Sequence, residues 1–389
     1  MRILFICGAL AAGEYAASFV PTISEVWPLA AMLAVVVSLF GYGLHVCGWP
    51  LVAVFLLGVS AFLWSSVGSE RLYREQPWMR GQLQYGRGAS VPREGLVAEV
   101  RADISRRVGL GLGHDGRVEA LNRAILLGER SRLPKEVKQV FVASGTMHVF
   151  AISGLHVMAV ALVLVYLLAC LLVPIRLAGA VAIPLLWGYV YLVGLTPSAV
   201  RAALMASICF LAPVFWRRAN LLRAWSLTFL LVHLVRPQMI TDVGNALSFA
   251  VMLSIALVVE WGRRGVCVPP VGIAVLAWAV GVPIGAHVFG QVAPGGILAN
   301  LVLITAAEWT VVSGAIGVVA SFASETVAVH FNNLSALCTK AMVGVAECVA
   351  RLPFSHFEVP RWTLLDCAEW YALLVLVVFL IHSIHQRKF

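Results

Sequence analysis

Long apolar stretches recur along most of the chain and predict membrane-spanning helices. A helix that crosses the hydrocarbon core of a bilayer needs about 20 predominantly apolar residues. Stretches that approach this length cover residues 3–20, 28–46, 49–67, 146–172, 177–194, 197–216, 221–236, 240–261, 268–289, 293–320 and 362–383. The more polar segment 325–350 also has a helical pattern, and we interpret it as an interfacial helix or one that lines the bundle.

Composition gives the same class. The chain is 61% hydrophobic and 12% charged, with a mean hydropathy of +0.91, whereas soluble domains carry about 25% charged residues. We expect an all-α polytopic membrane protein with about 10–11 transmembrane helices, some of them broken, and a short external basic segment. Residues 3–20 also resemble a signal peptide, but Glu14 interrupts them, so we interpret them as a retained first helix.

A segment of different composition separates residues 49–67 from the next apolar stretch. Between Glu70 and Val140 it holds 14 Lys/Arg against 9 Asp/Glu, a net charge of 14 − 9 = +5. Within it, "LVAEVRADI" alternates weakly and is a candidate strand. The following run, "VEALNRAILLGERSRLPKEVKQVF", has apolar residues at helical spacing, which Gly128 and Pro134 interrupt.

Arginines in short loops predict the orientation of the bundle. Arg217, Arg218, Arg223, Arg263 and Arg264 lie between apolar stretches, and such residues favour the cytoplasmic side. Counting crossings back from Arg217 places residues 68–140 on the external side of the membrane, which the chain crosses several times.

An external basic segment is suited to a polyanion, because Lys and Arg neutralise phosphates and release counterions. We take Arg101, Arg106 and Arg107 as candidates for binding a polyanion. Ordinary solubility and contact with anionic lipid are the alternative roles.

A block of polar residues opens the stretch "FVASGTMHVFAISGLHVMAVALVLVYLLACLL". Its candidate path-lining residues are Gly145, His148, Ser153, Gly154 and His156. On an unbroken helix the two histidines would lie about 12 Å apart along the axis, too far to bind one metal ion together. Ser153-Gly154 is a pair where a helix can kink, and freed backbone groups are tolerated where they line a cavity. A purely structural histidine pair is the alternative.

Further polar residues stand near three later helix starts. Polar groups at this depth usually face a bundle interior or a water-filled path, although snorkelling, capping and interhelical hydrogen bonding are alternatives. Broken helices around a polar centre are typical of translocation paths. The candidates are Ser198, Arg201, Asp242, Asn245, Ser248 and Asn300.

The order of five motifs resembles the ComEC competence-channel family. These are "AILLGERSRLPKEV", "FVASGTMHVFAISGLHV", "SAVRAALM", "DVGNALSFAVML" and "GGILANLVL", spread over about residues 118–385. The resemblance implies a polytopic bundle in a bacterial cytoplasmic membrane, whose pore passes single-stranded DNA. It also makes Arg101, Arg106 and Arg107 candidates for DNA capture. The chain differs from the family pattern in its shorter external segment, where the family has an oligonucleotide-binding barrel, and in the absence of a His-x-His-x-Asp-His nuclease motif.

The expected organisation is N-terminal transmembrane helices over 1–67, a reduced external segment over 68–118 and a competence-type transmembrane domain over 119–389. We expect a channel that takes up single-stranded DNA during natural transformation and is not an enzyme. A small-solute or lipid transporter is the main alternative, and an intramembrane serine protease using Ser153 is a weaker one. No metal or cofactor is predicted, since the eight cysteines stand singly. Expected partners are single-stranded DNA, membrane lipid, and separate nuclease, DNA-binding and motor proteins.

Overall fold

The apolar stretches after residue 140 form helices near the predicted boundaries. The computed structural model describes residues 95–386 except 114, 236–238, 240–241 and 264–267. The expected helices 3–20, 28–46 and 49–67 and residues 68–94, the first part of the basic segment, lie outside these residues. The later apolar helices are α7 (Gly154–Cys170), α8 (Ile175–Leu192), α9 (Pro197–Leu211), α10 (Leu221–Val235), α11 (Val243–Arg263), α12 (Pro270–Phe289), α13 (Gly295–Ala320) and α15 (Leu364–Gln386).

Four of these helices, α8, α11, α12 and α13, are long and apolar enough to cross a membrane, and α7, α9 and α10 are shorter apolar helices. In the described residues the only strands are β1 (Gln291–Val292) and β2 (Phe357–Glu358), which pair antiparallel. The chain is therefore an all-α polytopic membrane protein, as its composition predicted.

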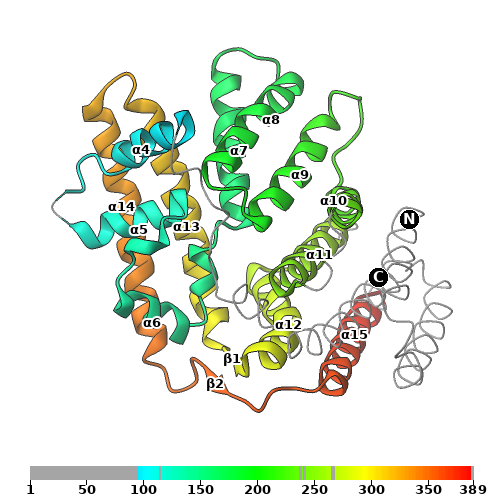
Figure 1. Cartoon of the computed structure of the whole chain (residues 1–389). Coiled ribbons are helices and arrows are strands. Elements are labelled where there is room, and N and C mark those ends of the chain that lie inside the picture. Colours follow the sequence, from blue (N-terminus) through cyan, green and yellow to red (C-terminus); the bar gives the residue numbers. More distant parts are fainter. Residues whose placement is uncertain (1–94, 114, 236–238, 240–241, 264–267, 387–389) are drawn as a thin grey trace.

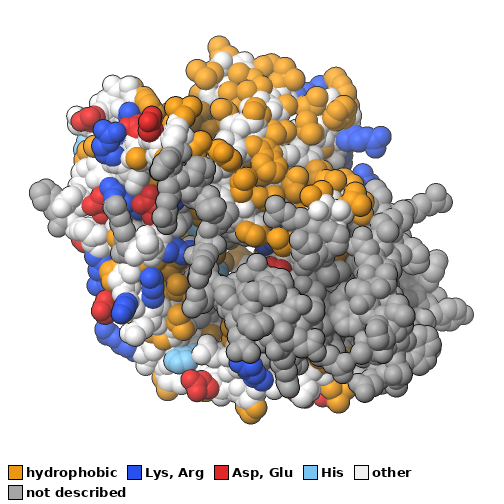
Figure 2. Space-filling view, viewed as in Figure 1, with side chains coloured by type: hydrophobic (Ala, Val, Ile, Leu, Met, Phe, Trp, Pro, Cys, Tyr) orange, Lys and Arg blue, Asp and Glu red, His pale blue; other side chains and the backbone are white. Residues whose placement is uncertain are grey.

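A second group of helices carries most of the charged surface. It consists of α4 (Leu96–Val108), α5 (Gly116–Leu127), α6 (Lys135–Ala143) and α14 (Glu325–Ala350), gathered along α13 (Figure 1). We call these four helices the charged lobe. Figure 2 shows Lys, Arg, Asp and Glu over this lobe, whereas hydrophobic side chains dominate the surface of α7–α9. Apolar and charged surfaces are thus segregated within the described part of the chain.

The candidate strand "LVAEVRADI" is wrong, because these residues belong to α4. The alternating apolar residues do not define a buried face, and Leu96 and Val100 are exposed. Asp103 instead pairs with Arg106 and Arg107, three and four residues later. Such pairs stabilise a helix, so local ion pairing outweighs the weak alternation.

Helix α5 confirms the predicted helix, which ends at Gly128 in a left-handed conformation. The Asp115 side chain accepts a hydrogen bond from the Val118 N–H at its start. This bond, together with Lys340, holds the pKa of Asp115 below its usual value. Because Lys340 belongs to α14, the same carboxylate caps one helix and links it to another.

A buried polar network joins α5 to α13 and α14. Asn122 donates to the Ser335 hydroxyl and accepts from Thr339, while Ser335 donates to the Thr310 carbonyl. The segment 325–350 is therefore a packed helix of the charged lobe.

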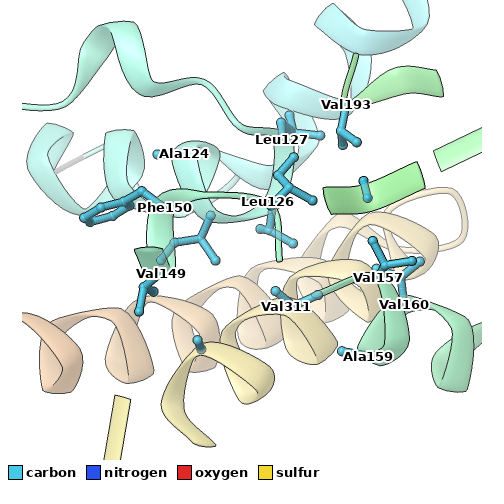
Figure 3. Close-up of a cluster of buried hydrophobic side chains, with 14 of the residues drawn as sticks. Ala124, Leu126, Leu127, Val149, Phe150, Val157, Ala159, Val160, Val193 and Val311 are labelled. Carbon is cyan, nitrogen blue, oxygen red and sulfur yellow. The ribbon is translucent and has the colours of Figure 1, made fainter. Parts of the chain in front are cut away.

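The apolar core continues from the charged lobe into the membrane bundle. It includes side chains from α5, α7 and α13 and from the short 3-10 helix η3 (Met147–Phe150). Figure 3 shows Leu126, Phe150, Val157 and Val311 within this cluster. Removal of apolar surface from water contributes a free energy of about 25 cal/mol per Å², which favours this arrangement. The lobe and α7 therefore share one core.

Candidate functional site at the broken helix ends

The polar block that opens the sequence motif interrupts the helix that was expected from residue 146. Helix α6 ends at Ala143, η3 covers Met147–Phe150, and α7 begins only at Gly154. The predicted start of the helix is therefore wrong by about two turns. The kink expected at Ser153-Gly154 is a complete helix start, so the two histidines do not share one face of a continuous helix.

Ser153 and His156 form a reciprocal cap at the start of α7. The Ser153 hydroxyl accepts from the backbone N–H of His156, and His156 Nδ1 accepts from the backbone N–H of Ser153 at 3.2 Å. His156 is buried, whereas His148 in η3 is exposed. A capping box satisfies helix N–H groups that would otherwise lack partners, which gives His156 a structural role at the break.

Gly145 lies where the broken segment meets the start of α13. Its φ is +73°, and a Cβ atom there would lie 2.6 Å from the Ala293 Cβ. Gly154 has more room, since its added Cβ would meet Ala202 at an ordinary 3.7 Å. The backbone thus approaches α13 closely only at the first of these two glycines.

We predict that Gly145→Ala destabilises the protein by about 1–3 kcal/mol, through backbone strain and the collision with Ala293. Gly154→Ala is the matched control and should change stability by much less. Thermal unfolding of the two purified variants in the same detergent measures the difference. Equal unfolding temperatures would contradict the assigned close approach.

Asn300 lies on the first turns of α13, next to the same junction. Its side-chain Oδ1 is buried and has no hydrogen-bond partner among the described residues. A buried polar atom without a partner is costly. Asn300 therefore stays a candidate for a path-lining residue.

Ser198 links α9 to the break before α7. Its hydroxyl donates to the Ile152 carbonyl, one residue before the Ser153 cap. Thr196 is the residue before α9, and its side chain makes no capping bond. The shared bond nevertheless brings the starts of two broken helices together.

Arg201 lies one turn further into α9 and is buried, with 5% of its surface exposed. Its guanidinium donates to Asn245 Oδ1 at 2.9 Å, to Ser248 Oγ at 3.2 Å and weakly to the Gly244 carbonyl at 3.4 Å. All three acceptors are neutral and belong to α11. The predicted residues Arg201, Asn245 and Ser248 therefore meet in one place.

No carboxylate forms an ion pair with Arg201 among the described residues. Asp242 acts on it only through a longer-range electrostatic attraction, while its own oxygen accepts from the Asn245 N–H at 2.6 Å and caps α11. Buried charges are usually paired or bind an ion. A buried guanidinium held by neutral oxygens is therefore suited to attract an anion.

His233 of α10 completes this cluster and was missed by sequence reasoning. Asn245 Nδ2 lies 3.2 Å from His233 Nε2, and His233 Nδ1 lies 2.7 Å from the Phe229 carbonyl. The second contact requires a proton on Nδ1, which leaves Nε2 to accept from Asn245. The bonds thus run in one direction from Arg201 through Asn245 to His233. A histidine near the end of an apolar helix was the signal available in the sequence.

The cluster lies at one end of the apolar bundle. It gathers the starts of α9 and α11 with the end of α10. The loop arginines lie at the opposite ends of these helices, where Arg263 donates to the Ala219 carbonyl. The orientation predicted from loop charge therefore puts the Arg201 cluster on the external half of the bundle.

The three candidate DNA-capture arginines differ in their surroundings. Arg101 donates to the carbonyls of Leu192 and Leu127, and Arg107 donates to Ser321 and stacks on the Phe322 ring at 4.0 Å. Both residues hold α4 against neighbouring elements. Arg106 is mostly exposed, and its one ion-pair partner among the described residues is Asp103 on its own helix, so it is the best placed of the three to meet a solute.

No group of three or more His, Cys, Asp or Glu side chains suited to a metal ion occurs within the described part of the chain.

Comparison with known proteins gives a family match over residues 125–383, about two thirds of the chain, to the family described as "Competence protein". The "ComE operon protein 3" of Bacillus subtilis (strain 168) is 32% identical over 135 residues, which are 35% of this chain and 17% of that protein. An uncharacterized protein of Aquifex aeolicus (strain VF5) is 34% identical over 149 residues, which are 38% of this chain and 35% of that protein. The matched regions thus cover a minor part of both relatives. No solved structure matches the chain.

Proposed function

The chain belongs to the competence protein family, and we propose that it is a membrane channel for the uptake of single-stranded DNA during natural transformation. The proposed setting is a bacterial cytoplasmic membrane, crossed several times. The observation that carries the proposal is the buried Arg201 between broken helix ends, held by neutral acceptors only.

The chemistry of the cluster suits a passing phosphate. A guanidinium presents five N–H donors in a planar fork that matches phosphate oxygens. The three hydrogen bonds that the Arg201 guanidinium donates within the described residues all go to neutral groups. Neutral acceptors compete with a phosphate less than a carboxylate would. Passage also requires that the strand is not held tightly, and the single buried cation of this cluster meets that requirement.

The remaining candidates form the proposed lining of the path. We assign Gly145, Ser153 and Gly154 to the break and Ser198 to the link between two helix starts. His148, exposed beside the break, and Asn300, with its unpartnered oxygen, offer neutral polar groups. Asp242 and His156 act through the caps that they form at α11 and α7.

A serine protease is disfavoured by the geometry at Ser153. A nucleophilic serine needs a hydrogen bond from its hydroxyl to a base. Within the described residues the Ser153 hydroxyl makes no hydrogen bond to a histidine ring. It accepts from the His156 N–H, and the Nδ1 atom of His156 accepts from the Ser153 N–H. We therefore propose that the chain is not an enzyme and that separate nuclease, DNA-binding and motor proteins act with it.

Purified protein in closed proteoliposomes tests the proposal against a small-solute transporter. Fluorescent single-stranded oligonucleotide should enter the vesicles when a binding protein inside traps it, whereas duplex of the same length should stay outside. Entry of small solutes without entry of the oligonucleotide would favour the transporter alternative.

We predict that Arg106→Gln weakens binding of single-stranded DNA and lowers the log–log salt slope by about 0.7, the value for one lost phosphate contact. Arg101→Gln should instead lower the unfolding temperature, because Arg101 bonds to two carbonyls. Fluorescence anisotropy over a range of salt concentrations measures the slopes. An unchanged slope for Arg106→Gln would assign this residue to solubility.

A further inference from the structure

Two loops at the end of the bundle opposite Arg201 contain bulky residues in a left-handed conformation. Leu172, just after α7, has a φ of 61°, and Trp216, after α9, has a φ of 56°. In both loops the following N–H bonds back to a carbonyl five residues earlier, Val173 to Leu168 and Arg217 to Ala212. Helix ends of this kind usually use glycine, because a side chain is strained there. The sequence keeps large apolar side chains at a conformational cost.

These side chains are not used for packing inside the protein. The exposed fractions are 75% for Leu171, 90% for Leu172, 68% for Phe215 and 81% for Trp216. Strain that persists where the side chains bury little surface points to a role for the projecting side chains. Figure 2 shows this end of α7–α9 as a hydrophobic surface with basic side chains at its margin.

Arginines surround the same two loops. Arg176 at the start of α8 lies 3.9 Å above the Trp216 ring, which brings the two loops together. Arg217 and Arg218 follow directly and are exposed. None of these three arginines forms an ion pair with a carboxylate in the described residues. We call Leu171, Leu172, Arg176 and Phe215–Arg218 the arginine–tryptophan tip.

We propose that the arginine–tryptophan tip binds the headgroup of an anionic phospholipid, with Arg217 and Arg218 on the phosphate and Leu172 and Trp216 among the adjoining acyl chains. Apolar side chains next to unpaired cations fit an anionic amphiphile better than a soluble anion, which would leave the apolar groups in water. Aromatic rings and arginine stems are also favoured at the membrane interface. This inference does not rest on the proposed function.

Lipid retention by the full-length protein tests the proposal. Protein reconstituted in phosphatidylcholine nanodiscs, with and without phosphatidylglycerol, is extracted, and its bound lipid is counted by native mass spectrometry. Wild type should retain phosphatidylglycerol in preference to phosphatidylcholine. Arg217→Gln/Arg218→Gln should lose affinity by about fivefold for each arginine. Arg223→Gln, which removes an exposed arginine from the neighbouring α10, is the matched control and should retain the lipid.

A second variant separates binding from folding. Trp216→Gly relieves the left-handed strain, so its unfolding temperature in phosphatidylcholine should equal or exceed that of wild type, while its retention of phosphatidylglycerol falls. Equal retention by wild type and the double arginine variant would overturn the proposal, as would unchanged retention by Trp216→Gly. Displacement of the lipid by a single-stranded oligonucleotide would assign the tip to nucleic acid instead, and displacement by inorganic phosphate would reduce it to a general anion site.

Discussion

Replacing Arg201 by leucine should abolish DNA uptake while the protein still accumulates in the membrane. The substitution removes the one buried cation of the cluster, and leucine suits an apolar helix. Arg201→Lys keeps the charge, but a lysine ammonium lacks the planar fork that reaches Asn245 and Ser248 together. It should therefore retain part of the uptake. Transformation frequency, normalised to the amount of protein in the membrane, measures both effects.

The control for this experiment is Arg223→Leu, which removes an exposed arginine at the opposite end of the bundle. It should leave uptake near the wild-type level. Normal uptake by a well-folded Arg201→Leu variant would show that the cluster serves only interhelical packing.

The helices of the bundle could be predicted from the sequence because apolar length alone decides them in a membrane. The helices α8 and α12 begin within two residues of the predicted starts. The first part of α4 was predicted as a strand, because its apolar residues alternate weakly. The ion pairs of Asp103 with Arg106 and Arg107 favour a helix and outweigh this alternation. The start of α7 was also misplaced, because the sequence does not show how many residues a break occupies.

Sequence spacing predicted which face of a helix is polar but not what lies opposite. Asn245 and Ser248 of α11 and Arg201 of α9 were each predicted as candidate path-lining residues. That these faces meet depends on how the two helices pack, which no local pattern records. His233 was missed for the same reason, because its significance comes from Asn245 on another helix. His156 shows the converse, since its bonds are to its own cap.

The hydrogen bonds among α9, α10 and α11 imply that the cluster contributes to stability as one unit. Asn245 lies in the middle, with Arg201 on one side and His233 on the other. Its Nδ2 also donates to the Met239 carbonyl at 2.8 Å. Hydrogen bonds that run in one direction polarise one another. Removal of the central member should therefore cost more than removal of either end.

Asn245→Leu should accordingly be the most destabilising single substitution in the cluster, at about 2–4 kcal/mol, because it leaves a buried cation with fewer acceptors. His233→Leu should cost less, since Asn245 Nδ2 still has the Met239 carbonyl.

The double variant Arg201→Leu/Asn245→Leu should be more stable than Asn245→Leu alone, because replacing both partners by apolar groups removes the stranded charge. Thermal unfolding of Arg201→Leu, Asn245→Leu and the double variant in one detergent, with wild type as reference, gives the coupling between the two positions. If the double variant is instead less stable than Asn245→Leu by the full cost of Arg201→Leu, the two residues act independently and Asn245 does not hold the guanidinium. A double variant that regains stability without regaining DNA uptake would show that uptake depends on the charge of Arg201, whereas stability depends on the hydrogen bonds that hold this charge in place.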